Sequence, residues 1–261
     1  MFVTFLSDFG LRDDFVGTCH GVIARIAPDA RVIDITHGIE PQAVLQGALV
    51  LASTLPYMPH GVHLAVVDPG VGGRRRAVCA RDREGRLHVG PDNGLLLPAV
   101  EHFGGVDGAW ELRNRAYMLE RVSHTFHGRD VFAPAAAHLS LGVPPEELGE
   151  GLETLLAFPP LRAHRCADGS LRAQVVHIDR FGNVVTDARA EDLPEGSLVV
   201  ELAGRRVVGP ARTYAEAAGL TALVGSSGYL EVALPNGSAA AALGVDIGEG
   251  VVVRPERSPG R

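Results

Sequence analysis

Lysine is missing from this chain: all 24 basic residues are arginine, against 31 acidic residues, and the net charge is −7. Its absence excludes a phosphate-binding P-loop, which needs its lysine, and imine-forming enzymes, which need an amine that can lose its proton. Arginine remains as the only permanent cation. Because arginine clusters only at positions 74–76, we expect no nucleic-acid partner.

Cysteine is also scarce. Cys19, Cys79 and Cys166 lie far apart and form no CxxC pair, which is typical of a reducing compartment. The N-terminal residues form no basic leader, and no apolar run is long enough to span a bilayer. We therefore expect a cytoplasmic protein with no membrane partner. Apolar residues make up 46% of the chain, enough for one large core or two smaller ones.

The first half alternates between two hydrophobic periods. Helical periods are expected from Asp13 or Asp14, from Pro41 to Pro56, and over 128–139. Nearly uninterrupted apolar runs between them predict strands at 2–6, 32–35, 61–67, 76–80 and 86–89. A polar turn at 82–85 predicts that the last two strands form a hairpin. This half is therefore expected to be an α/β/α domain with a mostly parallel sheet.

The second half has a different character. Paired prolines bracket a segment between Gly142 and Ala167, where we place the boundary between domains 1–160 and 168–261. Beyond it, short β-rich runs recur between turn residues, at 173–178, 184–186, 198–202, 222–224, 229–233 and 251–253. This spacing predicts a smaller all-β domain, a barrel or a sandwich.

Three segments of the first half carry candidate chemistry. Ser7-Asp8-Phe9-Gly10 and the run 68–73 follow predicted strands, where α/β proteins bind ligands, although ordinary strand-to-helix turns are an equal interpretation. The third segment, 124–130, holds His124 and His127, which suit a general base, a metal ligand or a polar loop. Their spacing matches no zinc signature, so no metal site is predicted.

Two segments of the second half are also open to two interpretations. Residues 179–183 and 225–229 have the composition of β-turns. An aromatic ring beside an amide side chain is also what an adenine base needs, one group for stacking and one for hydrogen bonding. Composition leaves both interpretations open.

Six ordered motifs together resemble one family. They are Ser7-Asp8-Phe9-Gly10 with Asp13 and 15–17, 67–72 with Arg75, 90–94, 125–130, 181–183 and 226–231. In order and spacing they are similar to the S-adenosyl-L-methionine hydroxide adenosyltransferases, which are related to fluorinase and chlorinase enzymes. The resemblance runs from the first predicted strand nearly to the C-terminus.

The resemblance implies an N-terminal α/β domain, a C-terminal β-barrel and a homotrimer. Each active site would lie between the N-terminal domain of one subunit and the C-terminal domain of the next. The implied reaction is attack of water or hydroxide on ribose C5′ of S-adenosyl-L-methionine, which releases adenosine and L-methionine. The sulfonium is already a good leaving group, so the implied reaction needs no cofactor and no metal.

The resemblance also implies residue roles. Asp68, Arg75 and His127 would bind and activate the water, with either Asp68 or His127 taking its proton. Asp8 would hold the ribose hydroxyls and Asp13 the methionine ammonium. The remaining substrate contacts would come from the second half: Phe181 stacked on adenine, Asn183 on its edge, and Asp179, Ser226, Ser227 and Asn236.

One departure and three alternatives remain. Related halogenases place an arginine after the serine matching Ser226, to bind the methionine carboxylate, whereas this chain has Ser227. A halogenase is one alternative, although three ionisable side chains would crowd and hydrate a halide pocket. The others are a metal-dependent hydrolase that uses Asp8, Asp68 and His127, and a non-catalytic binder of S-adenosyl-L-methionine or adenosine.

Overall fold

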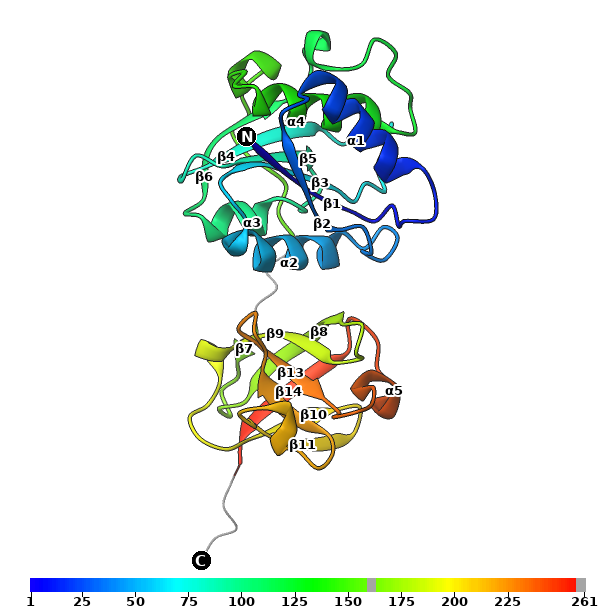
Figure 1. The fold of residues 1–261 in the computed structure, drawn as a ribbon. Coiled ribbons are helices and arrows are strands. Elements are labelled where there is room, and N and C mark those ends of the chain that lie inside the picture. The colour runs from blue at the N-terminus through cyan, green and yellow to red at the C-terminus, as the bar shows by residue number, and fades with distance from the viewer. Residues whose placement is uncertain (159–162, 257–261) are drawn as a thin grey trace, which may run out of the picture. The chain divides into compact units, whose positions relative to one another are not determined.

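The computed structural model describes residues 1–158 and 163–256. The chain divides into two compact units, Met1–Pro159 and Pro160–Arg261 (Figure 1). The first is an α/β unit and the second consists mainly of antiparallel strands. The expected fold class is confirmed.

A six-stranded sheet in the order β2-β1-β3-β5-β4-β6 forms the centre of the first unit. The three pairings among β2, β1, β3 and β5 are parallel, and β4 pairs antiparallel with β5 and β6. The predicted hairpin is therefore present as β4 and β5. The strand bounds are β1 Phe2–Ser7, β2 Arg31–Thr36, β3 Gly61–Val66, β4 Ala77–Asp82, β5 Leu87–Pro91 and β6 Val106–Glu111.

Helices cover both faces of this sheet, which buries apolar residues on each side. Helices α1 (Phe15–Ile26) and α4 (Ala133–Ser140) lie on one face, and α2 (Val44–Thr54) and α3 (Leu97–His102) lie on the other (Figure 1). The helical stripe predicted for α1 is buried as expected, with Val16, Cys19, Val22 and Ile23 in the core beside the sheet.

Two helices differ from their sequence prediction. Helix α2 begins at Val44 rather than at Pro41, because Gln42 adopts a left-handed backbone conformation with φ of 66° that a helix cannot include. The helix predicted over 128–139 begins with a π-helical turn at Gly128–Phe132 before α4. Single π-helical turns of this kind often occur at functional sites.

The second unit is a nearly closed antiparallel barrel. Its strands follow the order β11-β10-β14-β8-β9-β13-β12, and β7 pairs with β8. Ala211 donates its backbone N–H to the Ala222 carbonyl at 2.9 Å, which connects the two ends of this path. The bounds are β7 His164–Arg165, β8 Leu171–Ile178, β9 Val184–Arg189, β10 Leu198–Leu202, β11 Arg205–Gly209, β12 Thr221–Val224, β13 Tyr229–Ala233, α5 Ala239–Leu243 and β14 Gly250–Pro255.

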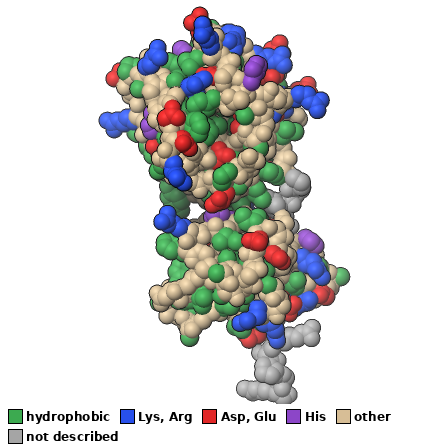
Figure 2. Space-filling model, turned by 90° about the vertical axis from the view of Figure 1, so that its right-hand side faces the viewer, with side chains coloured by type: hydrophobic (Ala, Val, Ile, Leu, Met, Phe, Trp, Pro, Cys, Tyr) green, Lys and Arg blue, Asp and Glu red, His purple; other side chains and the backbone are tan. Residues whose placement is uncertain are grey.

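Arginine and acidic side chains are interspersed on the face shown in Figure 2, and neither sign covers it. Within 1–158 and 163–256, no helix combines the length and the apolar character needed to cross a lipid bilayer.

Candidate active site

Strands β1 and β3 bring the first two candidate segments together. The strands are parallel neighbours, and Ser7 pairs with Val66 at their carboxyl ends. Asp8 follows the first strand directly, and Asp68 lies two residues beyond the second. Ligands bind at this edge of α/β sheets. The sheet register thus explains why two carboxylates 60 positions apart lie at one end of the unit.

Arg75 connects the other members of the predicted water-binding trio. Its Nε donates to Asp68 Oδ1 at 2.9 Å, and its Nη2 donates to Asp68 Oδ2 at 2.5 Å. The same Nη2 lies 2.7 Å from His127 Nδ1. The guanidinium carbon also lies 5.1 Å from the centre of the Phe132 ring. Asp68, Arg75 and His127 therefore form one connected group.

The contact with Arg75 fixes the tautomer of His127. A guanidinium has no acceptor, so Nδ1 must accept the hydrogen bond, and the neutral ring carries its proton on Nε2. Burial lowers the pKa of His127, and the nearby Arg75 charge lowers it further. The imidazole is consequently neutral at pH 7, with an N–H on its remaining nitrogen.

Two glycines allow the loops that carry this group to approach each other. Gly72 has a φ of 73°, and a Cβ there would collide with the His124 carbonyl. A Cβ at Gly128 would lie 2.8 Å from Phe9 Cζ. Glycine is therefore required at position 72, between the Asp68 and His127 loops. A larger residue at position 128 would have to displace the Phe9 ring, between the His127 and Asp8 loops.

Asp8 lies close to the trio and is partly withdrawn from water. Its Oδ2 accepts the Gln42 backbone N–H at 2.8 Å. Burial raises the pKa of Asp8 against the opposing effect of this hydrogen bond, and the negative charge of Asp68 raises it as well. Asp13 is exposed in the loop before α1 and makes no hydrogen bond or ion pair that involves another described residue.

Most of the second-half candidates line one hollow of the barrel unit, with a volume of about 730 Å³. Ligand pockets typically measure roughly 300–1,000 Å³. Five predicted residues line it, and Ser227 does not; the five are Asp179, Phe181, Asn183, Ser226 and Asn236. Phe181 is 78% exposed, so the faces of its ring are open for stacking.

Asp179 holds the loop that presents two of these residues. Its Oδ1 accepts the backbone N–H groups of Phe181 and Asn183 at 2.8 and 2.9 Å. Its Oδ2 accepts from Asn183 Nδ2 at 2.9 Å. Asn183 therefore directs its amide nitrogen to Asp179, which leaves the amide oxygen as its other polar atom.

The sequence interpretation missed Tyr214, Leu234, Pro235 and Gly237, which also line the hollow. Pro235-Asn236-Gly237 is a recognisable turn signature and could have been noticed. Tyr214 donates its hydroxyl to the buried carboxylate of Glu231. Burial raises the pKa of Tyr214 to about 12 and also raises that of Glu231. No sequence signal marks this pair, because the two residues lie 17 positions apart.

Two other motif segments have a structural role. Asp92 is 3% exposed and accepts from Arg76 Nε at 2.8 Å and from the Leu156 backbone at 2.7 Å. Asn93 donates to the Val67 carbonyl at 2.9 Å, which fixes the end of β3 before Asp68. Asp130 is fully buried, pairs with Arg129 at 2.6 Å and accepts the Ser123 N–H at 2.8 Å. These contacts anchor the loops on both sides of the trio.

Among the described residues, the donor atoms of Asp8, Asp68 and His127 do not converge within 4.8 Å of one another as a metal site requires. The Arg75 cation instead binds both Asp68 and His127. A second cation at this position would meet strong repulsion from the guanidinium. This geometry disfavours a metal-dependent hydrolase built on these three residues.

Known proteins are similar to this chain over nearly its whole length. Proteins named (R)-S-adenosyl-L-methionine hydrolase are 48% identical in Salinispora arenicola (95% of each chain) and 44% identical in Thermus thermophilus (97% of this chain, 98% of that protein). A fluorinase from Actinopolyspora mzabensis is 29% identical over 73% of this chain and 72% of its own.

Solved structures are also similar to this chain over nearly its whole length. An uncharacterized conserved protein from Thermotoga maritima has a TM-score of 0.88 at 33% identity and covers 96% of this chain and 99% of its own. Family models for the N-terminal and C-terminal domains of SAM hydroxide adenosyltransferases match residues 3–149 and 173–252. The chain belongs to the SAM hydroxide adenosyltransferase family.

Proposed function

We propose that this protein is an enzyme that hydrolyses S-adenosyl-L-methionine to adenosine and L-methionine. The observation that carries the proposal is the Arg75 guanidinium, which is hydrogen-bonded to Asp68 and His127 at the sheet edge that also carries Asp8. Family membership and the names of the full-length relatives support the same activity.

The reaction would be an in-line displacement at ribose C5′. A bond forms between water oxygen and C5′ while the C5′–S bond breaks, and its electron pair goes to sulfur to give the neutral thioether of methionine. Since the sulfonium needs no protonation to leave, catalysis consists of holding the nucleophile in line, partly desolvated, and accepting its proton.

Asp68 is the proposed proton acceptor. His127 Nδ1 already accepts from Arg75, so the neutral ring offers the water an N–H donor rather than a lone pair. The attacking oxygen becomes strongly acidic as its bond to carbon forms, so a carboxylate is a sufficient base late in the step. His127 would then orient the water, and Arg75 would stabilise the hydroxide character that develops.

We propose that Asp8 holds the ribose hydroxyls, because its carboxylate can accept two hydroxyl hydrogens. Asp13 would meet the methionine ammonium. Phe181 would stack on adenine, and Asn183 would hydrogen-bond its edge. Asp179 would act by holding the last two in place.

Ser226 and Asn236 would complete the substrate contacts from the hollow that they line. Ser227 is proposed to contribute to the methionine carboxylate contact, although it does not line that hollow. We further propose a homotrimer in which each substrate is shared between the N-terminal unit of one subunit and the C-terminal unit of the next. No cofactor enters this scheme.

The test is a product assay. Purified protein incubated with S-adenosyl-L-methionine should yield adenosine and methionine in equal amounts by chromatography, and Arg75→Ala and His127→Ala should lose most of this turnover. Unchanged turnover in both variants would remove the trio from the mechanism. Binding without products would indicate a sensor. A halogenated deoxyadenosine as the main product when chloride or fluoride is added would indicate a halogenase.

A further inference from the structure

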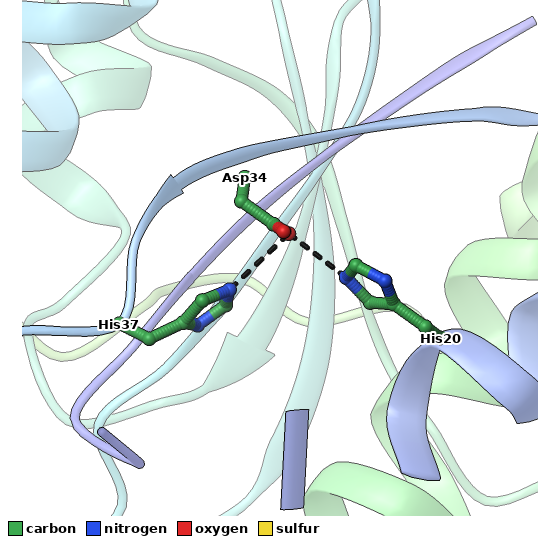
Figure 3. A group of neighbouring side chains, drawn as sticks. All are labelled: His20, Asp34 and His37. Atoms are coloured by element: carbon green, nitrogen blue, oxygen red, sulfur yellow. Dashed lines mark hydrogen bonds and ion pairs between the residues drawn. The ribbon is translucent and has the colours of Figure 1, made fainter. Parts of the chain in front are cut away.

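A second group of polar side chains in the first unit lies outside the proposed active-site contacts. His20 Nε2 is 2.9 Å from Asp34 Oδ1, and His37 Nε2 is 3.2 Å from the same oxygen. Figure 3 shows the two imidazole rings on opposite sides of the Asp34 carboxylate, each with a nitrogen directed toward it. Within the described part of the chain, this is the one group of three such side chains whose ligand atoms all lie within 4.8 Å of one another.

A backbone irregularity brings two of these side chains to the same place. His20 comes from α1, Asp34 lies in β2, and His37 follows the end of that strand. In a regular strand, residues three apart point to opposite faces. The pairing of β1 with β2 shifts so that Phe5 faces Asp34 while Leu6 faces Thr36, which leaves one extra residue between them. Such bulges change the direction of side chains.

His37 supplies an independent observation that points to a ligand. Its side chain is 3% exposed, and its Nε2 makes no hydrogen bond of acceptable geometry despite the short distance to Asp34. Its other nitrogen, Nδ1, lies 2.7 Å from Ser7 Oγ. A ring held by a hydrogen bond at one nitrogen, with the other nitrogen directed at a convergent carboxylate, is the usual arrangement of a metal-binding histidine.

The distances between the ligand atoms suit a small metal ion. Ligands about 2.0–2.1 Å from a tetrahedral zinc ion lie roughly 3.3 Å from one another. The two separations from Asp34 Oδ1, 2.9 and 3.2 Å, are close to this value, and the two histidine nitrogens lie within 4.8 Å of each other. The side chains of His20 and Asp34 are 36% and 40% exposed, so His20 has room to adjust and water can reach a fourth position.

We propose that His20 Nε2, Asp34 Oδ1 and His37 Nε2 form a binding site for a divalent transition-metal ion of the zinc class, with water as the remaining ligand. Two imidazoles and one carboxylate favour this class over calcium or magnesium, which prefer an all-oxygen site.

An ion at this site would tie α1 to the end of β2, near the loop that carries Asp8. Ser7 Oγ contacts His37 Nδ1, and the Gly10 backbone N–H donates to the His37 carbonyl at 2.8 Å. The site does not depend on the proposed hydrolysis, since neither His20 nor Asp34 belongs to the trio. Metal binding and turnover can therefore be tested separately.

The experiment uses full-length, chelator-stripped protein free of any histidine tag. It is titrated with Co²⁺, whose visible absorption is strong in four-coordinate sites, and the Co²⁺ is then displaced with Zn²⁺. We expect one equivalent per chain, and at least a tenfold loss of affinity in His20→Ala and His37→Ala. His102→Ala is the matched control, because this histidine is exposed and contacts only the Phe103 ring, edge to face, among the rings of the described residues; it should bind like the wild type.

His20→Ala is the decisive variant because its side chain is partly exposed and its loss should leave the fold intact, whereas His37 is buried. Circular dichroism checks that each variant is folded. The absence of a saturable equivalent in the wild type would overturn the proposal. Equal Co²⁺ affinity in the wild type and folded His20→Ala would do the same, and Asp34 would then simply hydrogen-bond to His20 and lie beside His37 without a metal ion.

Discussion

Arg75→Met tests the proposed role of the guanidinium. The substitution keeps an unbranched side chain but removes the cation and the donors to Asp68 and His127. Loss of one positioned donor to developing negative charge typically lowers kcat about 10²–10³-fold, or roughly 3–4 kcal/mol. We expect a loss of at least this size in S-adenosyl-L-methionine turnover, since one residue here serves both partners.

Stability should fall together with activity. The Asp68 side chain is 6% exposed, and loss of one partner from a buried ion pair typically costs about 3–5 kcal/mol. The assay must therefore run at a temperature where circular dichroism shows the variant to be folded. Arg74→Ala is the matched control, because Arg74 is the exposed neighbour in the same arginine run; it should retain wild-type turnover and stability.

The pH profile gives a second measurement on the same variant. The Arg75 charge contributes to the lowered pKa of His127, so turnover of the wild type should fall on the acid side only below about pH 6.5, the ordinary histidine value. Removal of the cation should raise this pKa, so the His127 ring of the folded variant should titrate at higher pH than that of the wild type when followed by NMR. A folded Arg75→Met variant with wild-type kcat, or a His127 pKa unchanged by the substitution, would exclude this role for Arg75.

Phe181→Ala should raise the KM for S-adenosyl-L-methionine about 5- to 150-fold, since base stacking on an aromatic ring contributes about 1–3 kcal/mol; an unchanged KM in steady-state assays would remove the stacking role. Arg75→Met changes the N-terminal unit and Asn183→Ala the C-terminal unit, so oligomers reassembled from both variants should contain some sites with neither substitution and should regain activity that neither variant has alone. No gain in oligomers confirmed to be mixed would contradict an active site shared between subunits. Chelators should leave turnover unchanged, and turnover that is lost and then restored by a divalent ion would contradict the metal-free mechanism. Burial lowers the pKa of His63 to about 3, below its unfolded value. As pH falls from about 6.5 toward 3, the unfolded state therefore binds a proton that the folded state does not, and the free energy of unfolding should fall by about 1.4 kcal/mol per pH unit. The free energy of unfolding of His63→Gln should depend less steeply on pH over this range.

Local pattern was enough to predict the fold class and most strands. The apolar stripe of α1 and the polar turn between β4 and β5 are local signals, and both elements are present. Elements without a strong local signal were missed, such as α3 (Leu97–His102) and β11 (Arg205–Gly209). The start of α2 was wrong because it depends on the left-handed Gln42, a residue type that gives no warning of that conformation.

The candidate site was predictable only in part. The sequence identified the residues that come together, but not how they are connected. The placement of Arg75 between Asp68 and His127, which also determines the tautomer of His127, depends on a contact between residues 52 positions apart. The hydrogen bond from Asn183 to Asp179 likewise could not be predicted from the sequence, because it depends on how the turn between them folds. His20 meets Asp34 only because the fold brings α1 close to β2, and Asp34 meets His37 where the register of that strand shifts; no spacing rule predicts either contact.

The most direct test of the central claim is turnover in ¹⁸O-labelled water, followed by mass spectrometry of both products. Attack of water at ribose C5′ places one ¹⁸O atom in adenosine and none in L-methionine, and His127→Ala should form far less of this labelled adenosine. Unlabelled adenosine, label in methionine, or no adenosine at all from folded wild-type protein would contradict the account.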